Sequence, residues 1–181
     1  KSSLIYCDSA HFYSEENLAK LFGNVKIDDQ KDSVVITSRY AEYDGDTQLA
    51  QLRNNVVLVN EGTTLYTDFL DYNRATGEAI YFNSGMVKDS TNVLTSEKGR
   101  YETQIEKITF NRKVVLENPD YTMKSNTLYY FTETKIAETD KLTNILSKDG
   151  NRLNAQKGSF YDTENKIFRF YDGDVESETS I

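Results

Sequence analysis

Apolar and polar residues alternate along most of the chain in short runs. In the run over residues 19–27, the odd-numbered positions hold Ala19, Leu21, Gly23, Val25 and Ile27. The even-numbered positions between them include Lys20 and Lys26. A period of two residues is that of a β-strand with one face buried. The pattern therefore predicts strands with one apolar face.

Six tyrosines recur along the chain at a nearly constant spacing, and five of them end the same short alternating pattern. These residues are Tyr13, Tyr43, Tyr72, Tyr101, Tyr130 and Tyr161, at steps of 30, 29, 29, 29 and 31. A turn rich in Asp, Asn, Gly and Thr follows each one, as in residues 44–47. A second strand, a second turn and a returning strand lead to the next tyrosine. Each repeat of roughly 30 residues is thus two strands and two turns, and six repeats give about a dozen strands.

The second strand of each repeat supplies the clearest apolar face. The expected inward positions are Ala19, Leu21, Gly23, Val25 and Ile27, then Ala50, Leu52, Val56 and Leu58, then Ile80, Phe82, Ser84 and Met86, then Ile108, Phe110, Arg112, Val114 and Leu116. The fifth repeat is degraded around Ile136, Leu142 and Leu146. Residues 15–21 have helical propensity, but the equivalent segments contain Gly45 and Gly77, which suit hairpin turns.

Strands joined by short turns pair antiparallel, and a single sheet buries one face by folding over on itself. We expect an all-β fold, an elongated, twisted, V-shaped β-jelly roll over residues 1–181, as one domain or a fragment of a longer chain. Free strand edges at both ends invite head-to-tail pairing. Small inward residues such as Ala41, Ala50 and Gly99 leave two interpretations open. Either they leave space for acyl chains in an apolar trough, or they balance large neighbours in a self-filled core.

The composition argues against a disordered protein and against some classes of binding partner. The chain is 38% hydrophobic with 13 Tyr and 9 Phe, which is too apolar and aromatic for a disordered protein. Its net charge of −8 disfavours binding to nucleic acid or to anionic membrane surfaces. No run approaches 18 apolar residues, so the sequence predicts no membrane-spanning helix.

The sequence offers few candidates for catalytic or metal-binding residues. His11 is the sole histidine and has no nucleophile elbow nearby, and the single cysteine, Cys7, is better explained as a small strand residue. Asp-rich turns such as residues 44–46 lack the twelve-residue calcium loop with a distal Glu. The repeated tyrosines could stack on sugars, but a buried core role is favoured. We therefore expect no catalytic residue, no metal and no cofactor, and a protein that is not an enzyme.

Two segments near the N-terminus carry a family resemblance: Cys-Asp-Ser-Ala-His-Phe-Tyr at residues 7–13 and Phe-Gly-Asn-Val-Lys-Ile at residues 22–27. Echoes of the second occur at residues 55–58, 113–116 and 173–176. In these motifs the chain resembles the OstA-like family, also called the LptA family. The resemblance covers nearly the whole chain, with short motifs in register across six repeats.

The resemblance implies a periplasmic carrier that holds the lipid A acyl chains of lipopolysaccharide in an apolar groove and passes them towards the outer membrane. It also implies head-to-tail pairing with other OstA/LptA-like domains. The expected lipid-binding residues are Leu21, Val25, Ile27, Leu52, Val56, Leu58, Phe82, Met86, Phe110, Val114 and Leu116. The alternatives are a structural β-solenoid and the periplasmic domain of an outer-membrane lipopolysaccharide translocon.

Overall fold

A computed structural model of the chain describes residues 3–31 and 33–176, and nearly all of its regular structure is β-strand. The strands are β1 (Ser3–Tyr6), β2 (Ser9–Tyr13), β3 (Leu18–Asp29), β4 (Val34–Asp44), β5 (Leu49–Asn60), β6 (Thr63–Asn73), β7 (Glu78–Lys88), β8 (Val93–Glu102), β9 (Lys107–Asn118), β10 (Tyr121–Phe131), β11 (Ile136–Thr139), β12 (Thr143–Ser147), β13 (Arg152–Ala155), β14 (Ser159–Asp162), β15 (Ile167–Phe170) and β16 (Gly173–Glu176). One short 3-10 helix, η1 (Thr103–Ile105), joins β8 to β9. The predicted all-β class is confirmed.

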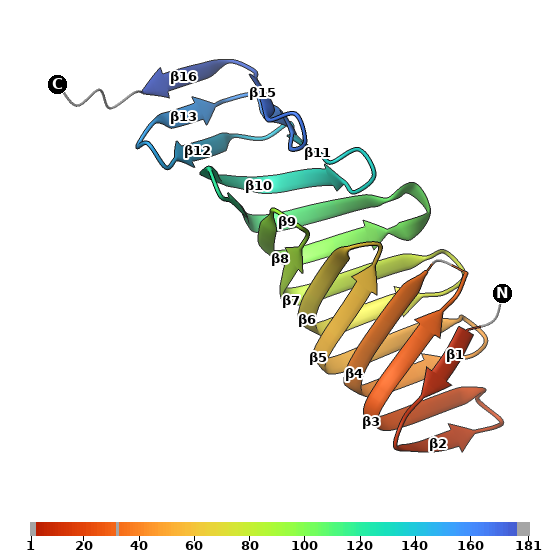
Figure 1. Cartoon of the computed structure of the whole chain (residues 1–181). Coiled ribbons are helices and arrows are strands. Elements are labelled where there is room, and N and C mark those ends of the chain that lie inside the picture. Colours follow the sequence, from red (N-terminus) through yellow and green to blue (C-terminus); the bar gives the residue numbers. More distant parts are fainter. Residues whose placement is uncertain (1–2, 32, 177–181) are drawn as a thin grey trace.

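The strands form one elongated antiparallel sheet, with β1 and β2 at one end of the molecule and β13 and β16 at the other (Figure 1). From β3 to β10 the long strands are neighbours in chain order. Beyond them each long strand is replaced by two short ones: β1 and β2 both pair with β3, and β11 and β12 both pair with β10. A strand position in the sheet is filled either by one long strand or by one such pair, and the pairs are β1/β2, β11/β12, β13/β14 and β15/β16. The eight long strands and the four pairs therefore fill twelve successive strand positions along the sheet. Six two-strand repeats, as predicted, account for these positions.

A bulge near the middle of β3, β5, β7 and β9 divides the sheet into two halves. At each bulge two residues oppose one on the next strand, as residues 54 and 55 of β5 oppose residue 68 of β6. Both bulge residues have positive φ, between 42° and 82°; the pairs are Gly23–Asn24, Asn54–Asn55, Asn83–Ser84 and Arg112–Lys113. Glycine and asparagine adopt this left-handed conformation most readily, and bulges of this kind bend a strand.

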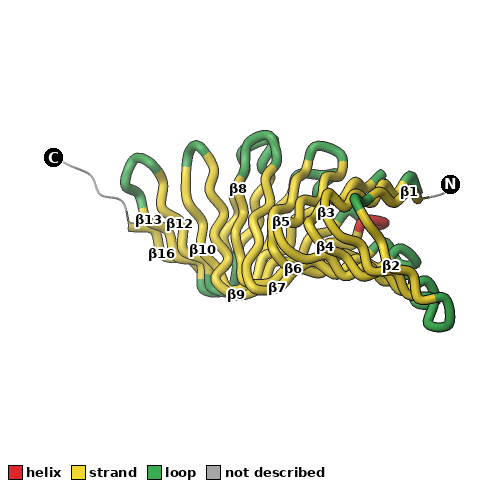
Figure 2. The backbone as a smooth tube through the Cα atoms, turned by 90° about the horizontal axis from the view of Figure 1, so that it is seen from below, coloured by secondary structure: helices red, strands yellow, loops and turns green. Residues whose placement is uncertain are grey.

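We call the half that carries the repeated tyrosines the tyrosine arm and the other half the opposite arm. Residues 18–22 of β3 and 70–73 of β6 lie in the tyrosine arm, which continues into β2 at one end and into β11, β14 and β15 at the other. Residues 25–29 of β3 and 63–67 of β6 lie in the opposite arm, which continues into β1 and into β12, β13 and β16. Figure 2 shows the strands of both arms stacked side by side along the molecule.

The core lies between the arms, on one face of the sheet. Val25, Ile27, Leu52, Leu58 and Leu70 are each at most 1% exposed, although they come from both arms. Residues at the free ends of the two arms also touch, because the side chain of Tyr72 in the tyrosine arm reaches Asp29 in the opposite arm. The sheet therefore folds over on itself, as its one apolar face requires.

The structure corrects the inward face predicted for β7. Its buried residues are Ala79, Tyr81, Gly85 and Val87, whereas Ile80, Phe82, Ser84 and Met86 lie on the outward face. Both faces of this strand carry apolar residues, so alternation did not distinguish them. The outward Phe82 packs 5.6 Å from the ring of Phe69, and the Arg53 guanidinium lies 5.5 Å from the Phe82 ring.

Tyr81 explains why the small residues of β7 and β8 face inwards. A Cβ atom on Gly99 would lie 2.0 Å from Tyr81 Cε1, and one on Gly85 would lie 2.4 Å from Tyr81 Cε2. The ring thus occupies the space above both glycines, and its hydroxyl lies 2.6 Å from Ser96 Oγ. Burial raises the pKa of Tyr81 to about 12. At this point the small inward residues balance a large neighbour.

The fifth repeat, which the sequence analysis describes as degraded, is irregular in the structure. Leu142 and Leu146 are each 47% exposed and Ile136 is half-buried, while Ala137 and Ile145 are the buried apolar residues. The strand is broken between Thr139 and Thr143, and this break separates two short alternating runs. Arg112, expected on the inward face of β9, is exposed because it lies in a bulge. Residues 14–17 form a turn between β2 and β3, so the helical alternative is wrong there.

Candidate functional site

Most of the residues expected to line a lipid site lie together on the inward face. The buried ones, each at most 5% exposed, are Leu21, Val25 and Ile27 of β3, Leu52, Val56 and Leu58 of β5, and Phe110, Val114 and Leu116 of β9. Phe82 and Met86 of β7 do not join them, because they lie on the outward face. The four strands on which lining residues were expected, β3, β5, β7 and β9, alternate with β4, β6 and β8, on which none were expected.

Those intervening strands supply about as much of the inward surface. The buried residues that were not assigned to the site include Ile36, Leu65, Leu70, Leu94, Met123 and Leu128. Each lies in a returning strand, in a short run with the same alternation as the second strands. The alternation that marks these residues as inward-facing was therefore visible in the sequence. A complete description of the inward face therefore takes residues from both strands of every repeat.

The free ends of the two arms, furthest from the bulges, meet along a line that we call the rim. Repeated tyrosines of the tyrosine arm reach across it to an acid or amide at the end of a strand in the opposite arm. These three rim pairs are Tyr72 Oη to Asp29 Oδ2 at 3.4 Å, Tyr101 Oη to Asn60 Oδ1 at 2.5 Å, and Tyr130 Oη to Asp89 Oδ2 at 2.6 Å. In each pair the tyrosine hydroxyl donates. The rim pairs close the inward face along the middle of the molecule.

The first rim pair is reinforced by an arginine. Arg74 Nε lies 3.2 Å from Asp29 Oδ2, and Arg74 also donates to the hydroxyl of Tyr43 at 3.2 Å. Burial raises the pKa of Asp29, but the backbone N–H of Lys31 and the Arg74 guanidinium lower it by more, so the net pKa lies below its ordinary value. Asp29 is therefore ionised when it accepts these hydrogen bonds at neutral pH.

The third rim pair places an ionised carboxylate beside a neutral phenol. Burial raises the pKa of Asp89, but hydrogen bonds from Tyr130 and from the backbone N–H groups of Thr91 and Asn92 lower it by more. The N–H groups lie 2.9 and 2.8 Å from Asp89 Oδ1. Burial and then the adjacent carboxylate raise the pKa of Tyr130. A hydrogen bond from a neutral hydroxyl to a carboxylate is stronger than one between two neutral groups.

At the C-terminal end the repeated tyrosine packs against other aromatic rings. Tyr161 makes aromatic contacts there: its ring stacks 3.9 Å from Phe168 and lies edge-on at 5.0 Å from Tyr121. A cavity of 340 Å³ lies beside these rings, between β10, β12 and β13 of the opposite arm and β15 of the tyrosine arm. Its apolar walls include Leu153 and Phe170. Inward-facing side chains are thus accessible at this end.

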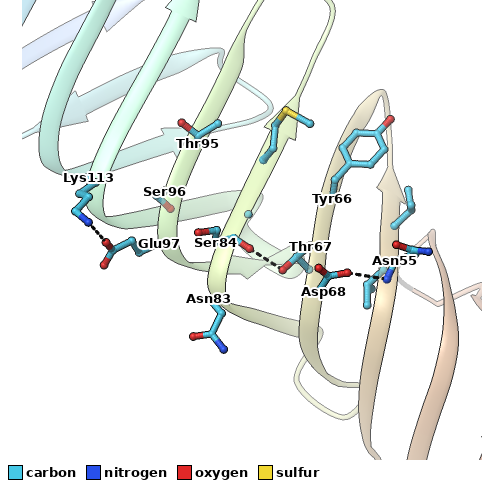
Figure 3. A pocket seen from close by; sticks show the side chains of 14 residues that line it. Asn55, Tyr66, Thr67, Asp68, Asn83, Ser84, Thr95, Ser96, Glu97 and Lys113 are labelled. Atoms are coloured by element: carbon cyan, nitrogen blue, oxygen red, sulfur yellow. Dashed lines mark hydrogen bonds and ion pairs between the residues drawn. The ribbon is translucent and has the colours of Figure 1, made fainter.

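A second hollow, of 680 Å³, lies beside the bulges on β5 to β9 (Figure 3). Its polar groups largely bond to one another. Asp68 accepts a hydrogen bond of 2.9 Å from the backbone N–H of Asn55, and Lys113 Nζ lies 2.6 Å from Glu97. These interactions hold neighbouring strands together across the bulges.

Among residues 3–31 and 33–176, no group of three or more His, Cys, Asp or Glu side chains could hold a metal ion. His11 lies on β2 and packs edge-on against the ring of Phe22 at 5.4 Å. The same part of the chain contains no helix that is long and apolar enough to cross a membrane.

Among solved structures, the chain is similar to LptH from Pseudomonas aeruginosa, described as the LptA-homologous periplasmic component of the lipopolysaccharide transport device. The identity is 12% and the TM-score 0.32, over 76% of this chain and 80% of LptH. No curated protein matches the sequence. Residues 1–126 match the model of the OstA-like protein family. The chain therefore belongs to the OstA-like protein family.

Proposed function

We propose that this chain is a lipopolysaccharide carrier that holds lipid A acyl chains between its arms and passes them towards the outer membrane. The observation that carries the proposal is the inward face, on which apolar residues follow one another from Leu21 in β3 to Met123 in β10. Membership of the OstA-like family supports it. The proposal includes a periplasmic location, because lipopolysaccharide must cross that compartment to reach the outer membrane.

The burial of apolar surface alone would drive lipid binding in such a site. Each methylene group that moves from water to an apolar site contributes about 0.8 kcal/mol, so long acyl chains bind without any directed polar contact. Val25, Leu52, Val56 and Val114 present similar apolar surfaces along the molecule, so a chain can move between neighbouring positions with little change in free energy. The direction of transport must then come from an energy source elsewhere.

The C-terminal cavity is a place where a ligand can first meet the inward face. Its walls combine aromatic rings with the exposed side chain of Arg152, which can pair with an anionic group on a lipid. At the other end β1 and β2 form an edge with exposed apolar side chains, including Leu4 at 43% and Phe12 at 66%. Head-to-tail pairing with another OstA-like domain would cover this edge.

A photo-crosslinking experiment with purified protein and lipopolysaccharide tests the proposal. A small diazirine-bearing residue replaces Val56 or Val114, which face inwards, or Val57 or Val115, which are their outward neighbours. We expect a lipopolysaccharide adduct by mass spectrometry from the two inward positions, and little from the outward ones. Equal labelling of both faces, or no adduct from a well-folded protein, would contradict the carrier function.

A second candidate, a structural β-repeat with a self-filled core, is favoured by the closed rim and by the Tyr81 ring above Gly99 and Gly85. This candidate needs no lipid, and it interacts through its sheet edges. Concentration-dependent filaments that form equally with and without lipopolysaccharide would support it. Filaments that form only when lipid is bound would support the carrier.

A further inference from the structure

The rim pairs repeat with the period of the fold. Their tyrosines, Tyr72, Tyr101 and Tyr130, are spaced by 29 residues in the sequence, and their partners Asp29, Asn60 and Asp89 are spaced by 31 and 29. Each pair joins a strand end of one arm to a strand end of the other. One tyrosine hydrogen bond of this kind therefore joins the arms in each of three successive repeats.

The bulges lie on the opposite side of the arms from the rim. Each bulge has two consecutive left-handed residues, such as Asn54 and Asn55, where one ladder hydrogen-bond step is lost. The ladders within each arm are continuous on both sides of this line. The two arms are thus regular, well-paired bodies joined along a line of irregular backbone, which is where a change in the angle between them costs least.

We propose that the three rim pairs act as a latch that holds the arms shut, and that the arms part about the line of bulges when the latch is released. This inference rests on the proposed function, because it explains how a lipid enters between arms whose facing side chains are buried. Each pair can break separately. The exchange of a tyrosine hydrogen bond for one with water changes the free energy little.

The residue that best reports opening at the rim is Val34. It is 0% exposed, and it pairs in the sheet with both Asp29 and Asn60, the acceptors of two rim pairs. Val25 is a matched reporter beside the bulge line, at 1% exposed. A cysteine at either site, with Cys7 replaced by serine, reacts with a thiol reagent only when its surroundings open.

The experiment compares the rate of thiol labelling at Val34→Cys and at Val25→Cys in three backgrounds. The first is unchanged at the tyrosines. The second carries Tyr72→Phe, Tyr101→Phe and Tyr130→Phe, and the third, as a matched control, carries Tyr6→Phe, Tyr66→Phe and Tyr129→Phe on exposed or outward-facing rings. We expect loss of the hydroxyls of Tyr72 and Tyr101, whose acceptors flank Val34, to speed labelling at Val34→Cys about fivefold each. Labelling at Val25→Cys should change less, and the control should have no effect at either site.

Equal acceleration at both reporters would mean that the substitutions only destabilise the whole fold, and would overturn the latch. Labelling at Val34→Cys that the rim substitutions leave unchanged would overturn it too. Should the triple variant fail to fold, the three single Tyr→Phe variants carry the same comparison. Uptake of a fluorescent fatty acid is measured in parallel. Faster labelling at Val34→Cys without any uptake would leave the latch in place and contradict the carrier function.

Discussion

The hydroxyl of Tyr101 donates a 2.5 Å hydrogen bond to Asn60 Oδ1, although the two residues are 41 positions apart and lie on different arms of the sheet. Tyr101 is 4% exposed and Asn60 is 6% exposed, so the bond is made away from water. Burial raises the pKa of Tyr101 and keeps its hydroxyl protonated as a donor. The regular spacing of tyrosines in the sequence thus corresponds to contacts between the arms.

Replacement of Tyr101 by phenylalanine should lower the free energy of unfolding by about 1–2 kcal/mol, because the acceptor Asn60 Oδ1 loses this bond in a buried position. Urea denaturation followed by circular dichroism measures the change. Tyr66→Phe is the matched control, since Tyr66 is 40% exposed. Similar losses in the two variants would mean that the rim pair contributes nothing beyond a generic effect of removing a hydroxyl.

The Asp89 carboxylate should make stability depend on pH in the acid range. Its pKa in the folded protein lies below the unfolded value of about 3.9, so the stability that it contributes is fully present above that value and is lost as pH falls through the folded pKa. We expect wild type to be more stable than Asp89→Asn at pH 6, and the difference to shrink between about pH 4 and pH 2. Unfolding free energies of both proteins across this range provide the measurement. A difference that stays constant with pH would show that the charge of Asp89 does not matter.

The packing of Tyr81 over Gly99 predicts a strong coupling between the two positions. A Cβ atom on Gly99 would clash with the ring, so Gly99→Ala should cost about 1–3 kcal/mol of stability. The same substitution should cost much less in a Tyr81→Leu background, where the ring is gone. A double-mutant cycle measures the coupling, and strictly additive effects would contradict this packing.

Much of the fold follows from period-two alternation and from the spacing of the tyrosines. The inward positions of β3, β5 and β9 outside the bulges were predictable because one face is apolar and the other mostly polar, as in Leu52 and Val56 against Gln51 and Asn55. In β7 the alternation fails as a guide, because Phe82 and Met86 outside are as apolar as Tyr81 and Val87 inside. The large outward residues there are accommodated by neighbours on other strands, such as Arg53, which no local pattern reveals.

The rim pairs could not be predicted from local pattern either. Asp29, Asn60 and Asp89 each lie at or beside the end of a strand, where polar residues are expected for turn chemistry alone. Their bonds to tyrosines on the other arm depend on the angle at which the sheet folds. That angle is set by the bulges, and only the Gly23–Asn24 and Asn54–Asn55 pairs have residue types that favour left-handed backbone at both positions. Arg112 and Lys113 adopt the same conformation without any such signal.

Arg112 offers a direct test of the bulge geometry. Its φ of 65° is unfavourable for a residue with a side chain and accessible to glycine, so Arg112→Gly should relieve about 1 kcal/mol of backbone strain. The gain competes with the greater freedom of glycine in the unfolded chain, which lowers stability by a similar amount at ordinary strand positions. We therefore expect Arg112→Gly to leave the unfolding free energy nearly unchanged. The same substitution at Glu117, an exposed residue in the regular part of β9, should lower it by about 1 kcal/mol. Chemical denaturation of the two variants decides the matter: equal losses would mean that residue 112 is not held in a left-handed conformation, and that the bulge does not bend the sheet at this position.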